Sequence, residues 1–251
     1  MGSPSRSLLR KEMMDRSIFA AVASLVFVLI CASGISPQMH AQDGKTSYPS
    51  MAPLDQYLIA DRQGEIALAR SAAPESISRD AKILVLGRHG YETAVEGKNG
   101  FVCLVERAWM APFDSPEFWN PKIRSPLCFN PPAVRSILPI AYKRTEIALA
   151  GQSKAQIIEW TKAAYAKKEL PALEPRAMCY MMSKAAYLTD GDGHNLAHLM
   201  FYAPPMYGAN WGADLPGSPV ILGQQGPPEL FTLFFVPVGR RSDGTPAPLP
   251  Q

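Results

Sequence analysis

The sequence lacks any concentration of charge of one sign. Its 25 Lys and Arg residues nearly balance its 22 Asp and Glu residues, and no basic run reaches five residues. Because nucleic-acid-binding domains carry a basic patch or stripe, the sequence indicates no nucleic-acid partner. Charged residues make up only 19% of the chain and hydrophobic residues 47%. These proportions exclude a disordered, collagen-like or coiled-coil chain and predict a globular protein.

The sequence also lacks the short motifs of several large enzyme classes. It contains no GxSxG, HExxH, GxxxxGK[ST], GxGxxG or CxxC pattern. Each of these patterns places a nucleophile, a metal or a phosphate in a defined local structure. No motif therefore points to a serine hydrolase, a zincin, a P-loop NTPase, a Rossmann enzyme or a thioredoxin-like protein.

One long apolar run is present, at residues 18–32, and it follows a basic start. It is shorter than the about 20 residues that span a bilayer and has the length of a signal-peptide core. Ala41 then offers a cleavage point. We therefore expect residues 1–41 to be a signal peptide and the mature protein to be secreted or periplasmic, touching a membrane only through that peptide during export. An uncleaved anchor and a lipoprotein site at Cys31 are the alternatives.

Three cysteines follow the expected signal peptide. An exported protein meets an oxidising medium, so one disulfide and one free thiol are expected. We predict a Cys103–Cys128 bridge, which would tie a Pro-rich loop to the strands before it, and a free Cys179 on a buried strand. The competing pairing joins Cys103 to Cys179 and frees Cys128.

Short apolar runs separated by turn signals predict a sheet built from hairpins. The expected strands cover residues 82–87, 91–96, 101–107, 177–184, 196–202, 219–222 and 230–238. We interpret 82–107 as a three-stranded meander, with turns at Arg88-His89-Gly90 and at Asn99-Gly100, since Asn-Gly between strands is a strong hairpin signal.

Helical spacing of apolar residues indicates two or three helices. One covers 54–72, a second covers 133–150 with an interruption at Pro139, and a third follows a capping box at Ser153–Gln156. Residues 110–132 contain many prolines and predict a long loop. Strands in local pairs with separate helices argue for an α+β fold with a mainly antiparallel sheet and Pro-rich long loops. We expect a mobile segment at 42–51, one domain at 52–239 and a disordered tail at 240–251.

The string Arg88-His89-Gly90, directly after a buried strand, resembles the start of the histidine phosphatase superfamily. In that family an RHG at the end of the first strand supplies a nucleophilic His and a phosphate-binding Arg. The resemblance implies that His89 accepts a phosphoryl group and that Arg88 binds it. The residues after Gly90 depart from the family, because they predict a strand and hairpin where the family has a loop and helix. We expect His89 to form no phosphoenzyme.

A second candidate site is a polar cluster near the C-terminal half. Asp190, Asp192, His194 and His198 lie close together in the sequence, and carboxylates with imidazoles can gather a divalent cation. A polar hairpin loop beside one partly buried His explains the same residues. A set of soft ligands near these positions could also hold Cu(I), although Met on strands usually fills a core. That set comprises Met178, Cys179, Met181, Met182, His198, Met200 and Met206.

The hairpin sequence NGFxCLV at 99–105 is similar to that of uncharacterised exported bacterial proteins, a resemblance that implies export and one compact domain but no activity. Our first hypothesis is an exported domain, more a binding protein than an enzyme and without a cofactor, that binds an unidentified small molecule or protein at aromatic loop residues. These residues are Phe113, Phe118, Trp119, Tyr207 and Trp211. The alternative hypothesis is a hydrolase that uses His89 or a divalent metal at His194 and His198.

Overall fold

The structure is a computed structural model, and it describes residues 48–191 and 196–249. The expected signal peptide at 1–41, most of the segment 42–51 and the metal candidates Asp192 and His194 lie outside the described residues. Within the described ranges, no helix is long and apolar enough to cross a membrane.

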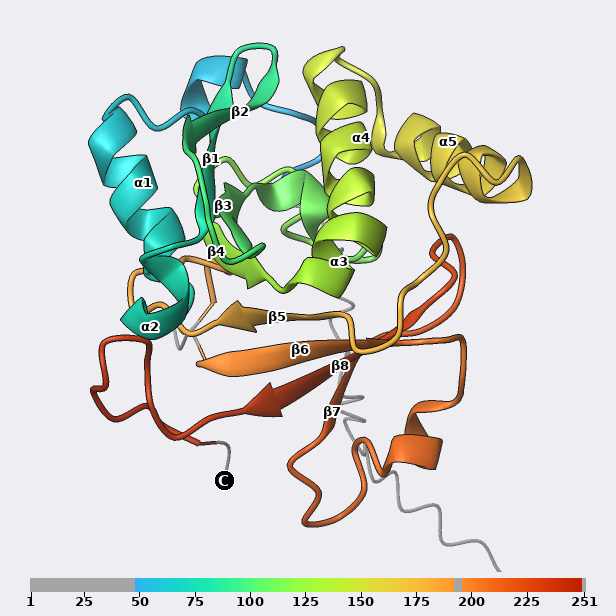
Figure 1. Ribbon diagram of the computed structural model, residues 1–251. Helices are drawn as coiled ribbons and strands as arrows, with labels where there is room; N and C mark the ends of the chain where they lie inside the picture. Colours follow the sequence, from blue (N-terminus) through green and yellow to red (C-terminus); the bar gives the residue numbers. More distant parts are fainter. Residues whose placement is uncertain (1–47, 192–195, 250–251) are drawn as a thin grey trace, which may run out of the picture. The chain divides into compact units, whose positions relative to one another are not determined.

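The described residues contain one sheet of eight strands, in the order β2-β1-β3-β4-β5-β6-β8-β7 (Figure 1). Every neighbouring pair is antiparallel except β1 with β3. A mostly antiparallel sheet that carries helices confirms the α+β prediction. The strands are β1 Lys82–Gly87, β2 Gly90–Val95, β3 Val102–Glu106, β4 Ser125–Phe129, β5 Met178–Met181, β6 His198–Ala203, β7 Ile221–Gln224 and β8 Thr232–Pro237.

Helices cover both faces of the first half of this sheet (Figure 1). Ile83 and Val85 point to the face covered by α1, whereas Leu84 and Leu104 point to the face covered by α3 and α4. This alternation follows from the period of two in a strand, and it places the two sets of side chains in separate cores. The helices are α1 Arg62–Arg70, α2 Glu75–Ser78, α3 Pro131–Ser136, α4 Leu138–Leu149 and α5 Lys154–Ala166.

The predicted meander at 82–107 is wrong. β1 and β2 form the expected hairpin, but β3 pairs in parallel with β1 rather than with β2. The chain after β2 crosses the start of β1 so closely that a Cβ on Gly97 would lie 2.2 Å from the Lys82 amide nitrogen. The Asn99 side chain holds this crossing by donating to the Ile77 carbonyl at 2.8 Å. The Asn-Gly pair therefore turns the chain around a strand instead of closing a hairpin.

The loop predicted at 110–132 contains a strand, β4, in its second half. β4 pairs with β3 despite Pro126, which takes the register position opposite Val105. Cys103 and Cys128 are directly opposite in this register and form a disulfide, with their Cα atoms 4.0 Å apart. The predicted pairing is confirmed, and Cys179 is free and buried. The bridge joins two adjacent strands rather than a strand and a loop.

Two helix predictions also need adjustment. The helix expected over 54–72 is divided into a short 3-10 turn at Leu54–Gln56 and α1, which begins where the Asp61 side chain accepts a hydrogen bond from the Gln63 amide at 3.0 Å. The helix expected over 133–150 is interrupted, as predicted, at Ile137, two residues before Pro139. The capping box at Ser153 and Gln156 is present at the start of α5.

Residues 240–249, part of the segment for which we expected disorder, form a turn against the end of β5. The Ser242 amide donates to the Met182 carbonyl at 3.1 Å, and Lys184 forms an ion pair with Asp243 at 2.7 Å. A bridge between Arg240 and Pro246 closes the turn.

Candidate functional site

The aromatic residues predicted to bind a ligand fall into two groups. Phe118 and Trp119 are buried, 1% and 4% exposed, and their rings meet edge to face at 4.8 Å in the core beside Tyr57. They are buried because the chain after β3 folds back on the domain. Tyr207 and Trp211 remain exposed, at 76% and 45%, and the Trp211 ring stacks on Phe234, which belongs to a different cluster. The four residues therefore do not share one exposed surface.

Phe113, the fifth aromatic candidate, packs with the buried pair. Its ring stacks on that of Phe118 with centroids 5.6 Å apart. The guanidinium carbon of Arg144 lies 4.2 Å from the centroid of the Phe113 ring. The loop thus contributes aromatic walls around a buried cation.

The residues of the phosphatase-like motif lie in the exposed turn between β1 and β2. Arg88 forms an ion pair with Asp55 at 2.5 Å, and His89 is exposed. His198 lies on β6, which is separated from β1 by β3, β4 and β5. At about 4.8 Å per strand this spacing is about 19 Å. The structure therefore does not bring His89 and His198 together.

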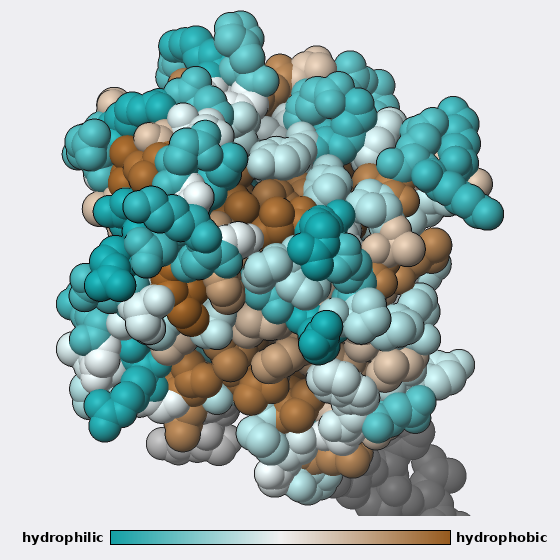
Figure 2. Space-filling view, in the orientation of Figure 1, coloured by the Kyte–Doolittle hydropathy of each residue, from teal (hydrophilic) through white to brown (hydrophobic). Residues whose placement is uncertain are grey.

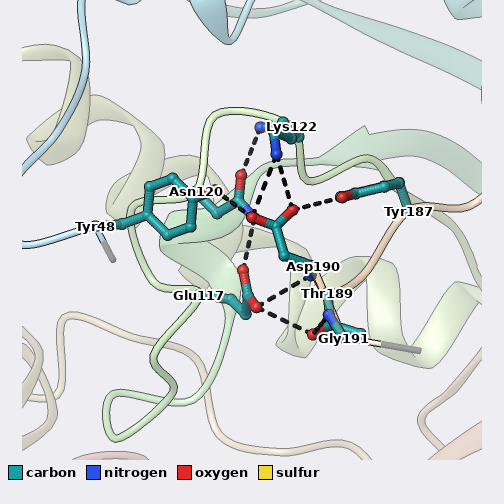
Figure 3. Close-up of polar contacts among 8 residues, drawn as sticks. All are labelled: Tyr48, Glu117, Asn120, Lys122, Tyr187, Thr189, Asp190 and Gly191. Carbon is teal, nitrogen blue, oxygen red and sulfur yellow. Dashed lines mark hydrogen bonds and ion pairs between the residues drawn. The ribbon is translucent and has the colours of Figure 1, made fainter. Parts of the chain in front are cut away.

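Asp190, the first member of the predicted metal cluster, belongs to a network of protein hydrogen bonds (Figure 3). Its carboxylate accepts from the hydroxyls of Tyr48 and Tyr187 and from the Lys122 ammonium at 3.2 Å. These donors, first that of Tyr187, lower the pKa of Asp190 well below its usual range. The Asp190 amide donates in turn to Glu117 at 3.1 Å. The network thus joins the chain around residue 117 to the chain around residue 190.

His198, the last member of that cluster, is buried at 6% exposure. Its Nδ1 lies 2.6 Å from the Leu196 carbonyl oxygen, and its ring packs on Phe235. Burial lowers its pKa, which favours the neutral ring. Within residues 48–191 and 196–249 no group of three or more His, Cys, Asp or Glu side chains could hold a metal ion.

The soft-ligand set predicted for Cu(I) is mostly part of the interior. Cys179 and Met200 are register partners on β5 and β6 and lie in the core beneath α3 and α4. Burial raises the pKa of the Cys179 thiol, so it behaves as a small apolar side chain. Met200 also borders a cavity.

That cavity has a volume of about 240 Å³ and lies between the sheet and α4. Strands from β3 to β8 contribute one wall, and α4 with the loop 110–117 contributes the other. Most of the lining is apolar, which makes the cavity suitable for a hydrophobic ligand. The principal apolar residues are Leu127, Ile137, Ile140, Met200, Phe231 and Phe235.

Glu106 is the polar group that distinguishes this cavity. It lies two residues after Leu104 on β3, so both side chains point to the same face of the sheet. The Glu106 side chain therefore points to the cavity rather than to α1. The residue is 8% exposed, and among the described residues its carboxyl group forms no hydrogen bond or ion pair. Burial raises its pKa to about 8, and the Arg144 cation only partly opposes this rise. At neutral pH the carboxyl is therefore mostly protonated.

A buried ion pair lies on another wall of the same cavity. Arg144 of α4 is 3.1 Å from Glu229, and it also donates to the Ala111 carbonyl at 2.9 Å. Glu229 accepts a further hydrogen bond from Gln224 at 2.7 Å. The Arg144 Nε is buried without a hydrogen-bond partner among the described residues. That nitrogen has almost no accessible surface, so Glu106 is the residue that presents an unpaired polar group to the cavity.

Glu106, Arg144 and Glu229 are not among the site residues predicted from the sequence, although two of them carry a signal. Glu106 occupies the inward parity of a strand that we predicted to be buried, and Arg144 follows Ile140 and Ala141 by one helical turn on an apolar helix face. An ionisable residue at such a position indicates either a buried ion pair or a site. Glu229 has no such signal, since it lies in an irregular segment after two prolines.

Comparisons with family models, with curated proteins and with solved structures find no match to this chain. The proposal below therefore rests on the chemistry of the cavity.

Proposed function

We propose that this protein is an exported binding protein whose cavity between the sheet and α4 takes one small, mainly apolar molecule. The observation that carries the proposal is the coincidence, in one 240 Å³ space, of an apolar lining with a carboxyl group at Glu106 that forms no hydrogen bond or ion pair among the described residues. A merely structural space would be expected to lack such a group, because leaving a buried polar group unpaired costs about 1–3 kcal/mol.

The cavity volume limits the size of the ligand. It exceeds the ~150 Å³ of an apolar cavity that holds benzene and falls below the ~300 Å³ at which drug-sized pockets begin. A single aromatic ring or a branched alkyl group with one polar substituent therefore fits best. The proposal moves the binding site from the exposed aromatic loops, Tyr207 and Trp211, to the interior of the domain.

Two observations support export. The basic start and the apolar run 18–32 are typical of a signal peptide, and the Cys103–Cys128 disulfide is typical of an oxidising compartment. N-terminal sequencing of exported material should begin near Gln42. Intact Met1 on a membrane-bound product would contradict export.

The binding proposal is tested by calorimetry and thermal unfolding with a panel of small aromatic and branched aliphatic compounds. At least one should bind saturably and raise the melting temperature, because a ligand at 100 times its Kd adds about 2.7 kcal/mol to the unfolding free energy. Met200→Trp and Ile140→Phe place extra volume in the cavity from opposite walls. Each should weaken that binding by about tenfold or more.

Tyr207→Ala is the matched control, because it removes the most exposed of the predicted aromatic residues and leaves the cavity intact. Its affinity should equal that of the wild-type protein. Binding that survives both cavity-filling substitutions but is lost in Tyr207→Ala would overturn the proposal in favour of the loop surface. A panel with no ligand at all would also contradict it.

A further inference from the structure

We propose that the ligand of this cavity is an apolar amine, bound as a cation whose ammonium group pairs with Glu106. This inference rests on the proposed function and assigns the charge class of the ligand. It follows from the balance of ionisable groups around the cavity and from the position of Glu106, the carboxyl group of the described lining that forms no hydrogen bond or ion pair.

Acidic side chains outnumber basic ones in the lining. Glu106, Glu117 and Glu229 border the cavity together with Arg107 and Arg144. Both arginines are already neutralised: Arg107 by Glu65 at 2.8 Å on the opposite face of the sheet, and Arg144 by Glu229 at 3.1 Å. Among the described residues no cation forms an ion pair with Glu106, and Arg144, whose charge acts on it, is already paired with Glu229. A bound cation is therefore the partner that the Glu106 carboxyl group lacks.

Glu117 does not take this role. Its carboxylate accepts hydrogen bonds from Asn120 at 2.6 Å, from Thr189 at 3.0 Å and from the Asp190 amide, all outside the cavity wall (Figure 3). Glu106 is therefore the carboxyl group that is free to receive a ligand.

Several titratable groups surround Glu106 on neighbouring elements. Arg144 on α4 is the cation among them, and Tyr91 on β2, Cys179 on β5 and Tyr202 on β6 are acids whose pKa values burial raises. Phenols and thiols with raised pKa values stay neutral at physiological pH. Glu229 before β8 pairs with Arg144, and Glu117 is satisfied as described above. Glu106 is thus the group whose protonation a ligand would change.

Ligands of other charge fit the cavity less well. A carboxylate would add a further anion to a lining already rich in acids and would meet one guanidinium that is shared with Glu229. A neutral molecule could accept from the protonated Glu106, but it would gain no ionic interaction. An ammonium group turns the unfavourable carboxylate into a partner, since an opposite charge within about 4–6 Å favours the ionised acid.

Binding of the cation has a defined proton balance. The protonated Glu106 loses its proton to the buffer as the ammonium ion enters, and the product is a carboxylate–ammonium pair. No covalent bond forms or breaks apart from that O–H bond. Because the pKa of Glu106 is about 8 in the free protein, the complex should release nearly one proton at pH 6.5 and only a small fraction of one at pH 9.

The test uses three ligands with one carbon skeleton and different charges: 2-phenylethylamine, 2-phenylethanol and phenylacetate. Calorimetry of the full mature protein is run at pH 6.5 and pH 9 in pairs of buffers that differ in ionisation enthalpy, which counts the protons released. We expect the amine to bind at least about tenfold more tightly than the alcohol at pH 9, phenylacetate to bind most weakly, and the affinity for the amine to rise with pH.

The substitution Glu106→Gln should weaken amine binding by about tenfold or more, abolish proton release and leave the affinity for the alcohol within about threefold. Glu92→Gln, an exposed carboxylate on β2, is the matched control and should change neither. The proton count is measured on the unmodified protein, so the test does not depend on whether the variant folds.

The outcomes separate the two proposals. Equal or tighter binding of the alcohol or of phenylacetate, or amine binding without proton release at pH 6.5, would overturn the amine inference and leave the binding function standing. Failure of all three ligands and of the wider panel would overturn the binding function itself.

Discussion

Two buried ion pairs lie on opposite faces of the sheet, and they differ in how completely they are satisfied. Glu65 and Arg107, on the α1 face, are 1% exposed, whereas Arg144 and Glu229 border the cavity on the other face at 3% and 1%. Arg107 donates to Glu65 at 2.8 Å, to the Tyr57 carbonyl at 2.7 Å and to the Val105 carbonyl. Glu65 also accepts from the Leu86 amide at 3.1 Å.

The cavity face shows the opposite pattern. Arg144 keeps an unsatisfied Nε, and Glu106 has a carboxyl group without a partner among the described residues. Glu106 ends β3 and Arg107 follows it, so two consecutive residues direct an acid to the cavity and a base to the α1 face. The same chain that gives every guanidinium nitrogen of Arg107 an acceptor leaves the Glu106 carboxyl group without a partner among the described residues beside an accessible space, which argues that the cavity serves a ligand rather than the stability of the fold.

The largest expected effect comes from breaking the satisfied pair. Glu65→Ala leaves the Arg107 guanidinium buried without its counterion, and removal of one partner of a buried ion pair costs about 3–5 kcal/mol. Urea denaturation at neutral pH should show this loss in the unfolding free energy. Glu92→Ala on β2 breaks an exposed ion pair with Arg62, which lies on α1 as Glu65 does. This substitution should lower the unfolding free energy by no more than about 0.5 kcal/mol. Equal losses in the two variants would show that the buried Glu65–Arg107 pair contributes no more to stability than the exposed Arg62–Glu92 pair.

The second prediction concerns the pH dependence that Glu106 gives to stability. Its pKa is raised to about 8 in the folded protein, well above the usual value of about 4.3 in an unfolded chain. Between these values the folded protein holds a proton that the unfolded chain has lost, so the unfolding free energy falls as pH rises. The slope approaches 1.4 kcal/mol per pH unit, which gives a loss of about 2 kcal/mol between pH 6 and pH 8.

Glu106→Gln should remove this loss, and the difference between the two proteins is measured by urea denaturation at pH 6, 7 and 8. His198 contributes in the opposite direction, because burial lowers its pKa and stability falls as it becomes protonated at acidic pH. That contribution is the same in both proteins and cancels in the difference. Parallel pH profiles for wild type and variant would show that the Glu106 carboxyl group is not buried in its neutral form.

The fold could be predicted from the sequence to the extent that its signals are local. Apolar runs at 82–87 and 230–238, the capping box at Ser153 and the interruption at Pro139 each report a local conformation, and each is present. The order of β1, β2 and β3 could not be predicted, because Asn99-Gly100 fixes a turn but not the strand that the chain meets after it. β4 was missed because three prolines close to it conceal a strand whose partners come from distant parts of the chain.

The candidate site was less predictable than the fold. Sequence reasoning weighs residues by type, so it selected His, Trp and acidic clusters, including Asp190, whose carboxylate the structure occupies with protein donors. The cavity depends on volumes left between β3, β6 and α4, and no local pattern encodes such a space. One criterion would have selected Glu106: it is an acidic residue at a position of a buried strand whose side chain points into the core.

The smallest expected effect is a difference in stability when side-chain volume is added on the cavity face of the sheet and on its α1 face. Leu127 lines the cavity on β4, whereas Ile83 is fully buried in the α1 core on β1. Leu127→Phe can extend into the empty space, so we expect its unfolding free energy to change by less than about 1 kcal/mol. Ile83→Phe must displace packed neighbours, and overpacking of a dense core costs about 1–3 kcal/mol. Urea denaturation of both variants measures the difference in unfolding free energy. Binding of 2-phenylethanol is a second measurement, and we expect it to be weaker in Leu127→Phe but unchanged in Ile83→Phe. Equal costs in the two variants would mean that the space beside Leu127 closes in solution, and a closed space could not admit the proposed ligand.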